Sequence, residues 1–424
     1  MRAARIGFIC LMVLSGLAGT LQAQTTIVVT STLDFAEQDD DVGRVDNYTC
    51  GFTAGAFFEP APNGICTLRR AVLEAGVRPD ADRPITIAFD IPTSDPNYDP
   101  ALELWEVQID SSFIWEIDRR FISDDGGQVT IAGSSQPTGR DDGPRIMINT
   151  NSENNPLFGR SLEVRTSNNV IRDLGFKGGG QIILYEGGNI VENVWMGLRN
   201  DGSGLSLAST ASSQAQRSMA RGGIIMPNVD SDNNIIRNNT IIGAFERAIR
   251  VTSGGNNNLI TGNRIGTNAS GVVPIPGTID CTRDLDFDGK LWYGGRGIQV
   301  TGSDNTITDN IFAGLHVTQA TNDTPPIAME IAGIDNLVTG NTIGLDASDA
   351  EVGVCGQGML LQGSEGIVTE NRLFFTRNGF DPGDHRARDR HRVEGVRVPR
   401  LPQGEQPPPV VHHAGVGGVL EAQP

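Results

Sequence analysis

The chain has few aromatic residues, few cysteines and few histidines for its length. Aromatics make up 6% of its 424 residues, and it has 5 Cys and 5 His. Its 53 Gly residues favour many short strands joined by turns over helical bundles. The scarce His and the absence of a C-x-x-C spacing exclude the common zinc patterns. No nucleophile elbow, P-loop or zinc-protease motif is present either.

Positive charge is also scarce. There are 33 Lys and Arg against 51 Asp and Glu, which gives a formal net charge of −18. An acidic surface argues against nucleic acid and against anionic membranes, because both attract basic patches. It is compatible with divalent cations or neutral sugars, although acidity by itself usually serves solubility. We therefore expect no nucleic-acid partner.

Only the N-terminus carries a long apolar run. Arg2 and Arg5 precede IGFICLMVLSGLAG, and LQA before Gln24 offers Ala23 as the residue before a cleavage site. This pattern predicts a signal peptide over 1–23. The chain is therefore predicted to be secreted, periplasmic or at the outer cell surface, as a monomer with no transmembrane segment after cleavage.

Export gives the cysteines an oxidising compartment, in which disulfides form. Four cysteines remain after cleavage, and four allow three pairings. We prefer Cys50 with Cys66 and Cys281 with Cys355, because each pair brackets a plausible insertion.

The first part of the mature chain changes its hydrophobic period once. TTIVVTSTLDF at 25–35 alternates like a strand. CTLRRAVLEAGV at 66–77 has helical spacing instead, with Thr67 as a cap and Gly76 as the expected end. The apolar face of this helix comprises Leu68, Ala71, Val72 and Ala75. Further short strands are expected at 84–92, 105–109, 128–133 and 145–149.

From about Ser167 one motif recurs: an Asn, two aliphatic residues, and a second Asn five positions after the first. The repeated Asn residues are Asn234 and Asn239, Asn258 and Asn263, Asn305 and Asn310, Asn336 and Asn341, and Asn371 in a copy that begins at Gly366. Looser copies begin at Asn169 and Asn189. The gaps after Asn189 and after Asn258 are near twice the others, so each is predicted to hide an unmarked coil.

A short repeat of this kind cannot bury its apolar face alone, but stacked copies share one core. An Asn can adopt left-handed backbone at the turns, or it can point inward and bond the neighbouring turn. The varied coil length argues against a left-handed β-helix, which needs strict hexapeptides. The repeat therefore predicts an all-β fold, a right-handed parallel β-helix.

Two segments resemble known families. CTLRRAVLEA is similar to the CSLREA motif of many secreted bacterial proteins, with Thr67 in place of Ser and Arg70 in place of Glu, and 85–137 resembles that family's entry region. The GNxIG copies resemble the β-helix repeats of the pectate-lyase-like superfamily. The resemblance covers about 25–380 and implies a short helix that caps the N-terminal end of the solenoid. It implies no single activity, because the superfamily includes lyases, hydrolases, epimerases and adhesins.

The sequence thus divides into a signal peptide at 1–23, a CSLREA-like cap region at 24–83, parallel β-helix repeats at 84–383 and an irregular tail at 384–424. The tail holds four of the five His, many Arg and Pro, and no strand pattern. It is either a functional basic or metal-binding tail or the product of a frameshift that truncated a longer β-helix. The frameshift is the preferred interpretation.

One acidic segment is a candidate metal site. DLDFDGK places Asp284, Asp286 and Asp288 at alternate positions before Gly289, like the first half of a calcium loop. The closing Glu of such a loop is missing, because Gly295 stands at its position. Calcium binding and a solvated acidic loop both remain open.

A second segment carries candidate catalytic residues. A polysaccharide lyase needs a base, often Arg or Lys, near carboxylates or calcium. GAFERAIRV offers Glu246, Arg247 and Arg250, and alternation directs Arg250 outward. An outward Arg more often serves solubility.

Two function classes remain. The preferred one is a non-catalytic exported β-helix that serves adhesion or carbohydrate binding, with Trp195, Trp292 and Tyr293 as candidate sugar platforms. The alternative is a polysaccharide-active enzyme, a uronate polysaccharide lyase or a glycoside hydrolase. The expected partner is an extracellular polysaccharide or a cell surface, and calcium is the one candidate cofactor. Repeat features explain nearly every residue that can be placed, which favours the first class.

Overall fold

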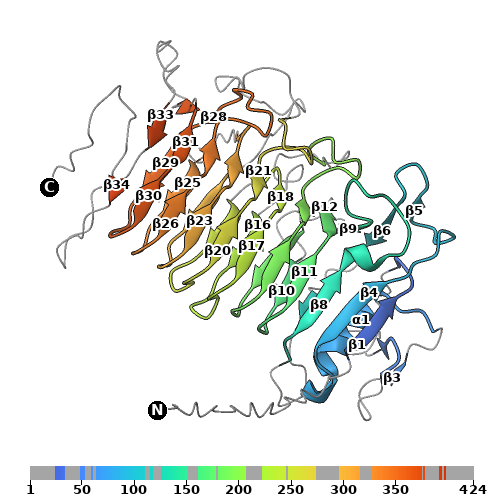
Figure 1. Cartoon of the computed structure of the whole chain (residues 1–424). Coiled ribbons are helices and arrows are strands. Elements are labelled where there is room, and N and C mark those ends of the chain that lie inside the picture. The colour runs from blue at the N-terminus through green and yellow to red at the C-terminus, as the bar shows by residue number, and fades with distance from the viewer. Residues whose placement is uncertain are drawn as a thin grey trace, which may run out of the picture.

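The chain folds into a right-handed parallel β-helix, as the repeats predict (Figure 1). Each coil contributes one strand to each of three long sheets, passing from sheet 1 to sheet 2, to sheet 3 and back to sheet 1. Neighbouring coils pair in parallel, about 4.8 Å apart. The computed structural model describes residues 24–33, 48–52, 59–60, 64–109, 115–117, 126–150, 161–177, 180–206, 222–244, 247–273, 296–315, 327–374, 376–377, 391–393 and 396–397.

The strands of each sheet follow in spatial order. Sheet 1 contains β1 (Thr25–Val29), β4 (Ile85–Phe89), β8 (Val129–Ala132), β11 (Val170–Arg172), β14 (Ile190–Glu192), β17 (Ile235–Arg237), β20 (Leu259–Thr261), β23 (Thr306–Thr308), β26 (Leu337–Thr339), β30 (Ile367–Thr369) and β34 (Val396–Arg397). Sheet 2 contains β5 (Tyr98–Asp99), β6 (Leu104–Gln108), β9 (Ile146–Asn149), β12 (Leu174–Lys177), β15 (Trp195–Met196), β18 (Thr240–Ile241), β21 (Arg264–Ile265), β24 (Ile311–Phe312), β27 (Thr342–Ile343), β31 (Asn371–Leu373) and β33 (His391–Val393). Sheet 3 contains β7 (Trp115–Ile117), β10 (Ser161–Val164), β13 (Gln181–Leu184), β16 (Gly222–Met226), β19 (Arg247–Val251), β22 (Ile298–Val300), β25 (Ile327–Ile331) and β29 (Gln357–Leu361). Two small pairs join β2 (Tyr48–Thr49) to β3 (Glu59–Pro60) and β28 (Val354–Cys355) to β32 (Thr376–Arg377).

The core is a set of stacked aliphatic columns. The middle residue of each three-residue strand of sheet 1 points inward and is buried, and the coils place these residues in register. This column comprises Ile171, Val191, Ile236, Ile260, Ile307, Val338 and Val368. Leu259 precedes the inward Ile260 and therefore lies half-buried on the outer side of its strand.

The two long gaps in the repeat hide no coil, so that prediction was wrong. β14 pairs directly with β17, and β20 pairs directly with β23. The additional residues lie in the connections from sheet 2 to sheet 3, before β16 and before β22. Strand pairing depends on the register of neighbouring coils, and a longer loop costs little additional closure entropy. The solenoid therefore accepts insertions there.

Two ladders of buried Asn residues run along both borders of sheet 1. The first comprises Asn169, Asn189, Asn234, Asn258, Asn305 and Asn336, and the second Asn239, Asn263, Asn310, Asn341 and Asn371. Except for the last Asn of each ladder, the backbone N–H of each ladder residue donates to the side-chain Oδ1 of the Asn in the next coil at 2.8–3.0 Å. These bonds satisfy polar groups that a buried turn would otherwise leave unpaired.

The ladder residues do not adopt left-handed backbone. That conformation belongs to the residue immediately before many of them, such as Asn257 at φ 55°, Asp304 at φ 57° and Asp335 at φ 56°. Asn and Asp tolerate this region better than other residues with a side chain. Each sharp turn thus uses two positions, an exposed residue that bends the chain and an inward Asn that closes the hydrogen bonds.

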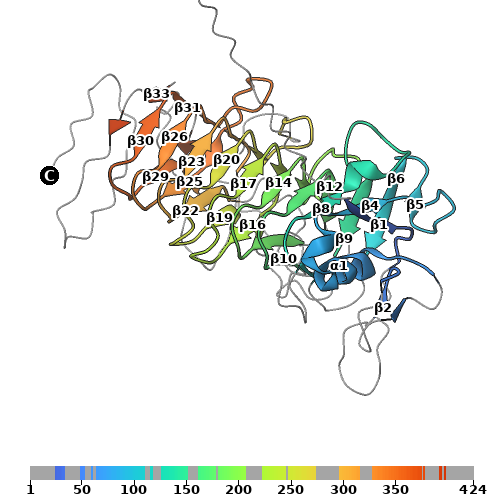
Figure 2. The same cartoon turned by 60° about the horizontal axis from the view of Figure 1, so that its bottom comes forward.

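Helix α1 (Leu68–Val77) covers the N-terminal end of the solenoid (Figure 2). Its predicted apolar face shares the main core with the first strands of sheet 1. Thr67 caps the helix and accepts from the backbone N–H of Arg70 at 3.3 Å. Gly76 does not end the helix, which continues to Val77. Pro79 explains this boundary, because the residue before a proline is disfavoured in helical backbone.

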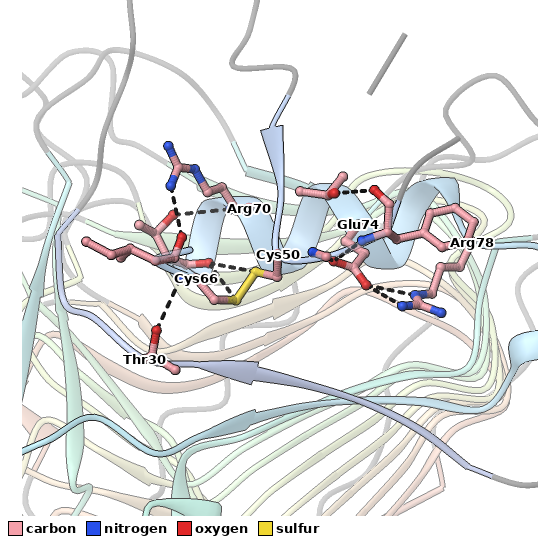
Figure 3. Close-up of a disulfide and its surroundings, with 11 residues drawn as sticks. Thr30, Cys50, Cys66, Arg70, Glu74 and Arg78 are labelled. Atoms are coloured by element: carbon pink, nitrogen blue, oxygen red, sulfur yellow. Dashed lines mark hydrogen bonds and ion pairs between the residues drawn. A yellow bond between two sulfur atoms is a disulfide. The ribbon is translucent and has the colours of Figure 1, made fainter. Parts of the chain in front are cut away.

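All ten residues of α1 are buried, although only one face is apolar. Its polar side chains are covered by the segment around the Cys50–Cys66 disulfide (Figure 3). The Glu74 carboxylate accepts from the Gly51 backbone N–H at 3.0 Å and from the Arg78 Nε at 2.9 Å. The disulfide is the pair preferred from the sequence. Cys355 is also disulfide-bonded, and its predicted partner Cys281 lies outside the described residues.

Two short strands of the tail, β34 and β33, pair at the other end of the solenoid. They run antiparallel to β30 and β31, so they cover the last edges of sheets 1 and 2. The segment that was expected to be irregular thus contributes two strands. None of the helices in the described part of the chain has the length and apolar character needed to cross a membrane.

Candidate functional site

Two of the three predicted catalytic residues, Arg247 and Arg250, lie on β19, in the middle of sheet 3. Ile249 and Val251 point into the core with 0% exposure, while Arg250 is exposed on the outer face. The sequence alternation placed these three side chains correctly. Arg250 pairs in register with Gln299 of β22, and Gln299 pairs with Glu330 of β25. Three adjacent coils thus place an arginine, an amide and a carboxylate in one outward row.

Arg247 joins this row from the start of β19. Its Nη2 lies 2.6 Å from Oε2 of Glu330, and the two side chains are 14% and 15% exposed. Such a partly buried, charge-assisted contact is stronger than a neutral hydrogen bond. We call Arg247, Arg250, Gln299 and Glu330 the sheet 3 cluster. Gln299 and Glu330 were not predicted from the sequence. The signal for Glu330 is that it is the one charged residue in the otherwise apolar strand IAMEI.

The other residues predicted for catalysis, calcium binding and sugar stacking fall between strands in the sequence. Glu246 directly precedes Arg247, and Asp284, Asp286 and Asp288 belong to the connection that enters sheet 3 before β22. Trp292 and Tyr293 belong to the same connection. All six lie outside the described residues, so the calcium loop and these aromatic platforms stay predictions.

Trp195, the third candidate sugar platform, lies on sheet 2 and is half-buried by its neighbours. The Arg140 guanidinium stands 5.0 Å from the centre of its ring. A Cβ on Gly143 or Gly202 would come within 2.4 or 2.7 Å of the same ring. The ring is thus wedged between two glycine turns and a guanidinium, an arrangement typical of packing.

A second polar cluster, centred on Glu106, lies on the outer face of sheet 2. The Glu106 carboxylate accepts from Asn149 Nδ2 at 2.9 Å and from Asn200 Nδ2 at 2.8 Å, and it is ion-paired with Lys177. Burial alone would raise the pKa of Glu106. The hydrogen bonds from Asn200, Lys177 and Asn149, together with the Lys177 charge, outweigh burial and hold the pKa below its usual value of 4.5.

Glu106 therefore remains ionised at neutral pH, with its oxygens occupied by donors. This carboxylate is unsuited to donating a proton, so the Glu106 cluster joins β6, β9 and β12 rather than performing chemistry. The sequence carries little sign of it, because Glu106 and Asn200 are far apart along the chain. Only the coil register brings the four residues together.

One family profile matches the chain. Residues 140–343 match the family described as periplasmic copper-binding protein (NosD). The match covers the β-helix from before β9 to β27. The periplasmic location in that description confirms the prediction of export. No curated protein matches the chain.

The His, Cys, Asp and Glu side chains among the described residues do not gather into a copper site. Copper sites in proteins use imidazole, thiolate and thioether ligands. No group of three or more His, Cys, Asp or Glu suitable for a metal occurs in the described part of the chain. Its three described cysteines, Cys50, Cys66 and Cys355, are all disulfide-bonded. These residues therefore offer no thiolate.

Proposed function

We propose that the protein is a non-catalytic, exported β-helix that binds an acidic extracellular polysaccharide along the outer face of sheet 3. The observation that carries this proposal is the sheet 3 cluster, in which Arg247 and Arg250 stand with one carboxylate, Glu330, on adjacent coils. Two guanidinium groups and one carboxylate thus belong to the same outward row. Arginine matches the planar carboxylates of uronate sugars.

The overall charge of −18 does not prevent such binding. The Debye length is about 8 Å at physiological ionic strength, so a bound carboxylate interacts mainly with the charges nearest to it. A polymer that lies along the solenoid axis would meet Arg250, Gln299 and Glu330 in succession, one coil apart. Gln299 supplies donors and acceptors for hydroxyl groups.

Binding is favoured over lyase chemistry because of how the cluster is paired. A lyase base must accept the proton next to the uronate carboxylate. The Arg247 guanidinium, one candidate for this base, is already part of an ion pair. The Glu330 carboxylate is already engaged by Arg247 at 2.6 Å. These contacts support recognition of an anionic ligand.

Copper is not part of this proposal. The family description names copper for its own members, and the described residues of this chain lack a fitting ligand set. The helix α1 has a separate role in the proposal. As the CSLREA resemblance implies, it closes the end of the solenoid and leaves the long faces for binding.

The test is affinity electrophoresis of the exported protein through gels that contain a uronate polymer or a neutral glucan. We expect retardation by the uronate polymer alone, and at least a fivefold weaker effect for Arg250→Ala. Arg264→Ala on sheet 2 is the matched control, because it removes an Arg from the outer face of a different sheet. Equal retardation of the wild type, Arg250→Ala and Arg264→Ala would contradict the proposal. New absorbance at 235 nm during incubation with the polymer would identify a lyase instead.

A further inference from the structure

The outer face of sheet 1 differs from the rest of the molecule in its regularity. From β11 to β30 every strand has three residues, of which the first and third point outward. The first is Val, Ile or Leu in every strand except β23, which has Thr306. The third is Thr in each of the four strands from β20 to β30. We call these two rows the aliphatic row and the threonine row.

This face carries almost no net charge, although the chain carries −18. The aliphatic row has no charged residue between β11 and β30. The other row has three charges, at Arg172, Glu192 and Arg237, and two of them pair with each other at 2.5 Å. Ile367 at the end of the aliphatic row is 45% exposed. A contiguous apolar strip of this kind on a soluble protein marks an interaction surface.

The face is also unobstructed between its two borders, as far as the described residues go. The Asn ladders and their turns border it on both sides, and its strands lie side by side at the front of Figure 1. The face repeats once per coil, about every 4.8 Å. A partner stays in register over seven strands only if it has the same repeat. A second copy of this solenoid has that repeat.

Charge and hydrophobicity also favour an antiparallel over a parallel orientation of two copies that pack through sheet 1. In an antiparallel pair related by a two-fold axis, the aliphatic rows face each other and Leu259 meets its counterpart at the centre. The border residues Asp304 and Glu365 then lie opposite Asn233 and Asn168, and Asp173 faces Glu370 as the one acidic pair of the other border. In a parallel pair the aliphatic row would instead face Arg172, Glu192 and Arg237. The acidic borders, such as Glu365 and Glu370, would then also face each other.

We propose that two copies of this chain associate antiparallel through the outer faces of sheet 1. The strip is about 30 Å long, since it spans six intervals of about 4.8 Å. On strands of three residues, about 10 Å wide, such a strip is smaller than a standard protein interface. The dimer is therefore weak and depends on concentration. It differs from the expectation of a monomer and leaves the sheet 3 faces of both copies on the outside.

Sedimentation velocity of the exported protein over a concentration series tests the association. We expect a rise in the mean sedimentation coefficient with concentration. Leu259→Lys should weaken the association at least tenfold, because it places two like charges at the two-fold axis. Two matched Thr→Lys variants provide the control. Thr306→Lys on sheet 1 should also weaken the association, whereas Thr342→Lys on sheet 2 should leave it unchanged. Thermal unfolding of each variant establishes that it is folded.

Cross-linking tests the orientation. Val170→Cys and Ile367→Cys lie at opposite ends of the aliphatic row. With a short bis-maleimide, a mixture of the two variants should cross-link while each variant alone should not. Cross-linking of Ile367→Cys with itself would overturn the antiparallel arrangement. A protein that stays monomeric at its highest soluble concentration would overturn the dimer.

Discussion

Sheet 1 and sheet 3 are built from the same coils but differ in how the chain enters and leaves them. Sheet 1 is bordered on both sides by Asn ladders, and from β11 onward each of its strands has three residues. Sheet 3 is entered by the connections of varied length that follow sheet 2, and its strands have three to five residues. One face therefore repeats along the solenoid, while the other changes from coil to coil.

This difference separates two kinds of function on one scaffold. A repeating face offers the same group at each coil, so it suits a partner with the same repeat. A face that changes can gather different groups, as Arg250, Gln299 and Glu330 do on neighbouring coils. Insertions concentrate on the variable side because the ladders exclude them from the borders of sheet 1.

The largest effect is expected from a substitution in one of the Asn ladders that border sheet 1. Asn310→Ala removes the Oδ1 that accepts from the Asn263 backbone and side-chain N–H groups, both at 2.9 Å. Each orphaned buried group costs about 1–3 kcal/mol, so we expect a loss of about 3 kcal/mol in the free energy of unfolding. Urea denaturation measures it. The control is Thr308→Ala, an outward residue two positions away, which should cost less than about 1 kcal/mol. Similar losses for both would contradict the role of the ladder.

Two ion pairs allow a direct test of the two faces. Arg247–Glu330 on sheet 3 is 14% and 15% exposed, whereas Arg237–Glu192 on sheet 1 is 44% and 13% exposed. Double-mutant cycles to Ala should give a coupling free energy of about 1 kcal/mol for the sheet 3 pair and at most about 0.5 kcal/mol for the other, because solvent screens the exposed pair. Equal couplings would show that the sheet 3 cluster is not specially shielded.

The smallest expected effect concerns calcium. If the connection with Asp284, Asp286 and Asp288 binds calcium at the millimolar affinity of extracellular modules, millimolar calcium should add less than about 1 kcal/mol of stability. Differential scanning calorimetry with and without calcium measures the shift in melting temperature. Asp286→Asn should abolish that shift, and Asp304→Asn, an acidic turn residue on sheet 1, should leave it unchanged. If calcium leaves the melting temperature of the wild type unchanged, this connection does not bind calcium.

Periodic features were predictable from the sequence, and features that depend on register between distant coils were not. The inward Ile249 and the outward Arg250 follow from alternation within one strand. Glu330 could not be assigned to Arg247 in advance, because the length of the connections conceals which coils are adjacent. The same uncertainty produced the hidden coils that the structure corrects, since a long gap and an additional coil look alike in sequence.

The sequence by itself determined the solenoid, the export signal and the positions of the repeated Asn residues. Each of these depends on local pattern, either a period along the strand or a residue type that a sharp turn demands. The tertiary structure alone decided which side chains share a face, because stacking brings together residues that are dozens of positions apart. Stacking also explains why Glu106 is held by Asn149, Lys177 and Asn200, and why the aliphatic row of sheet 1 is uncharged on an acidic protein.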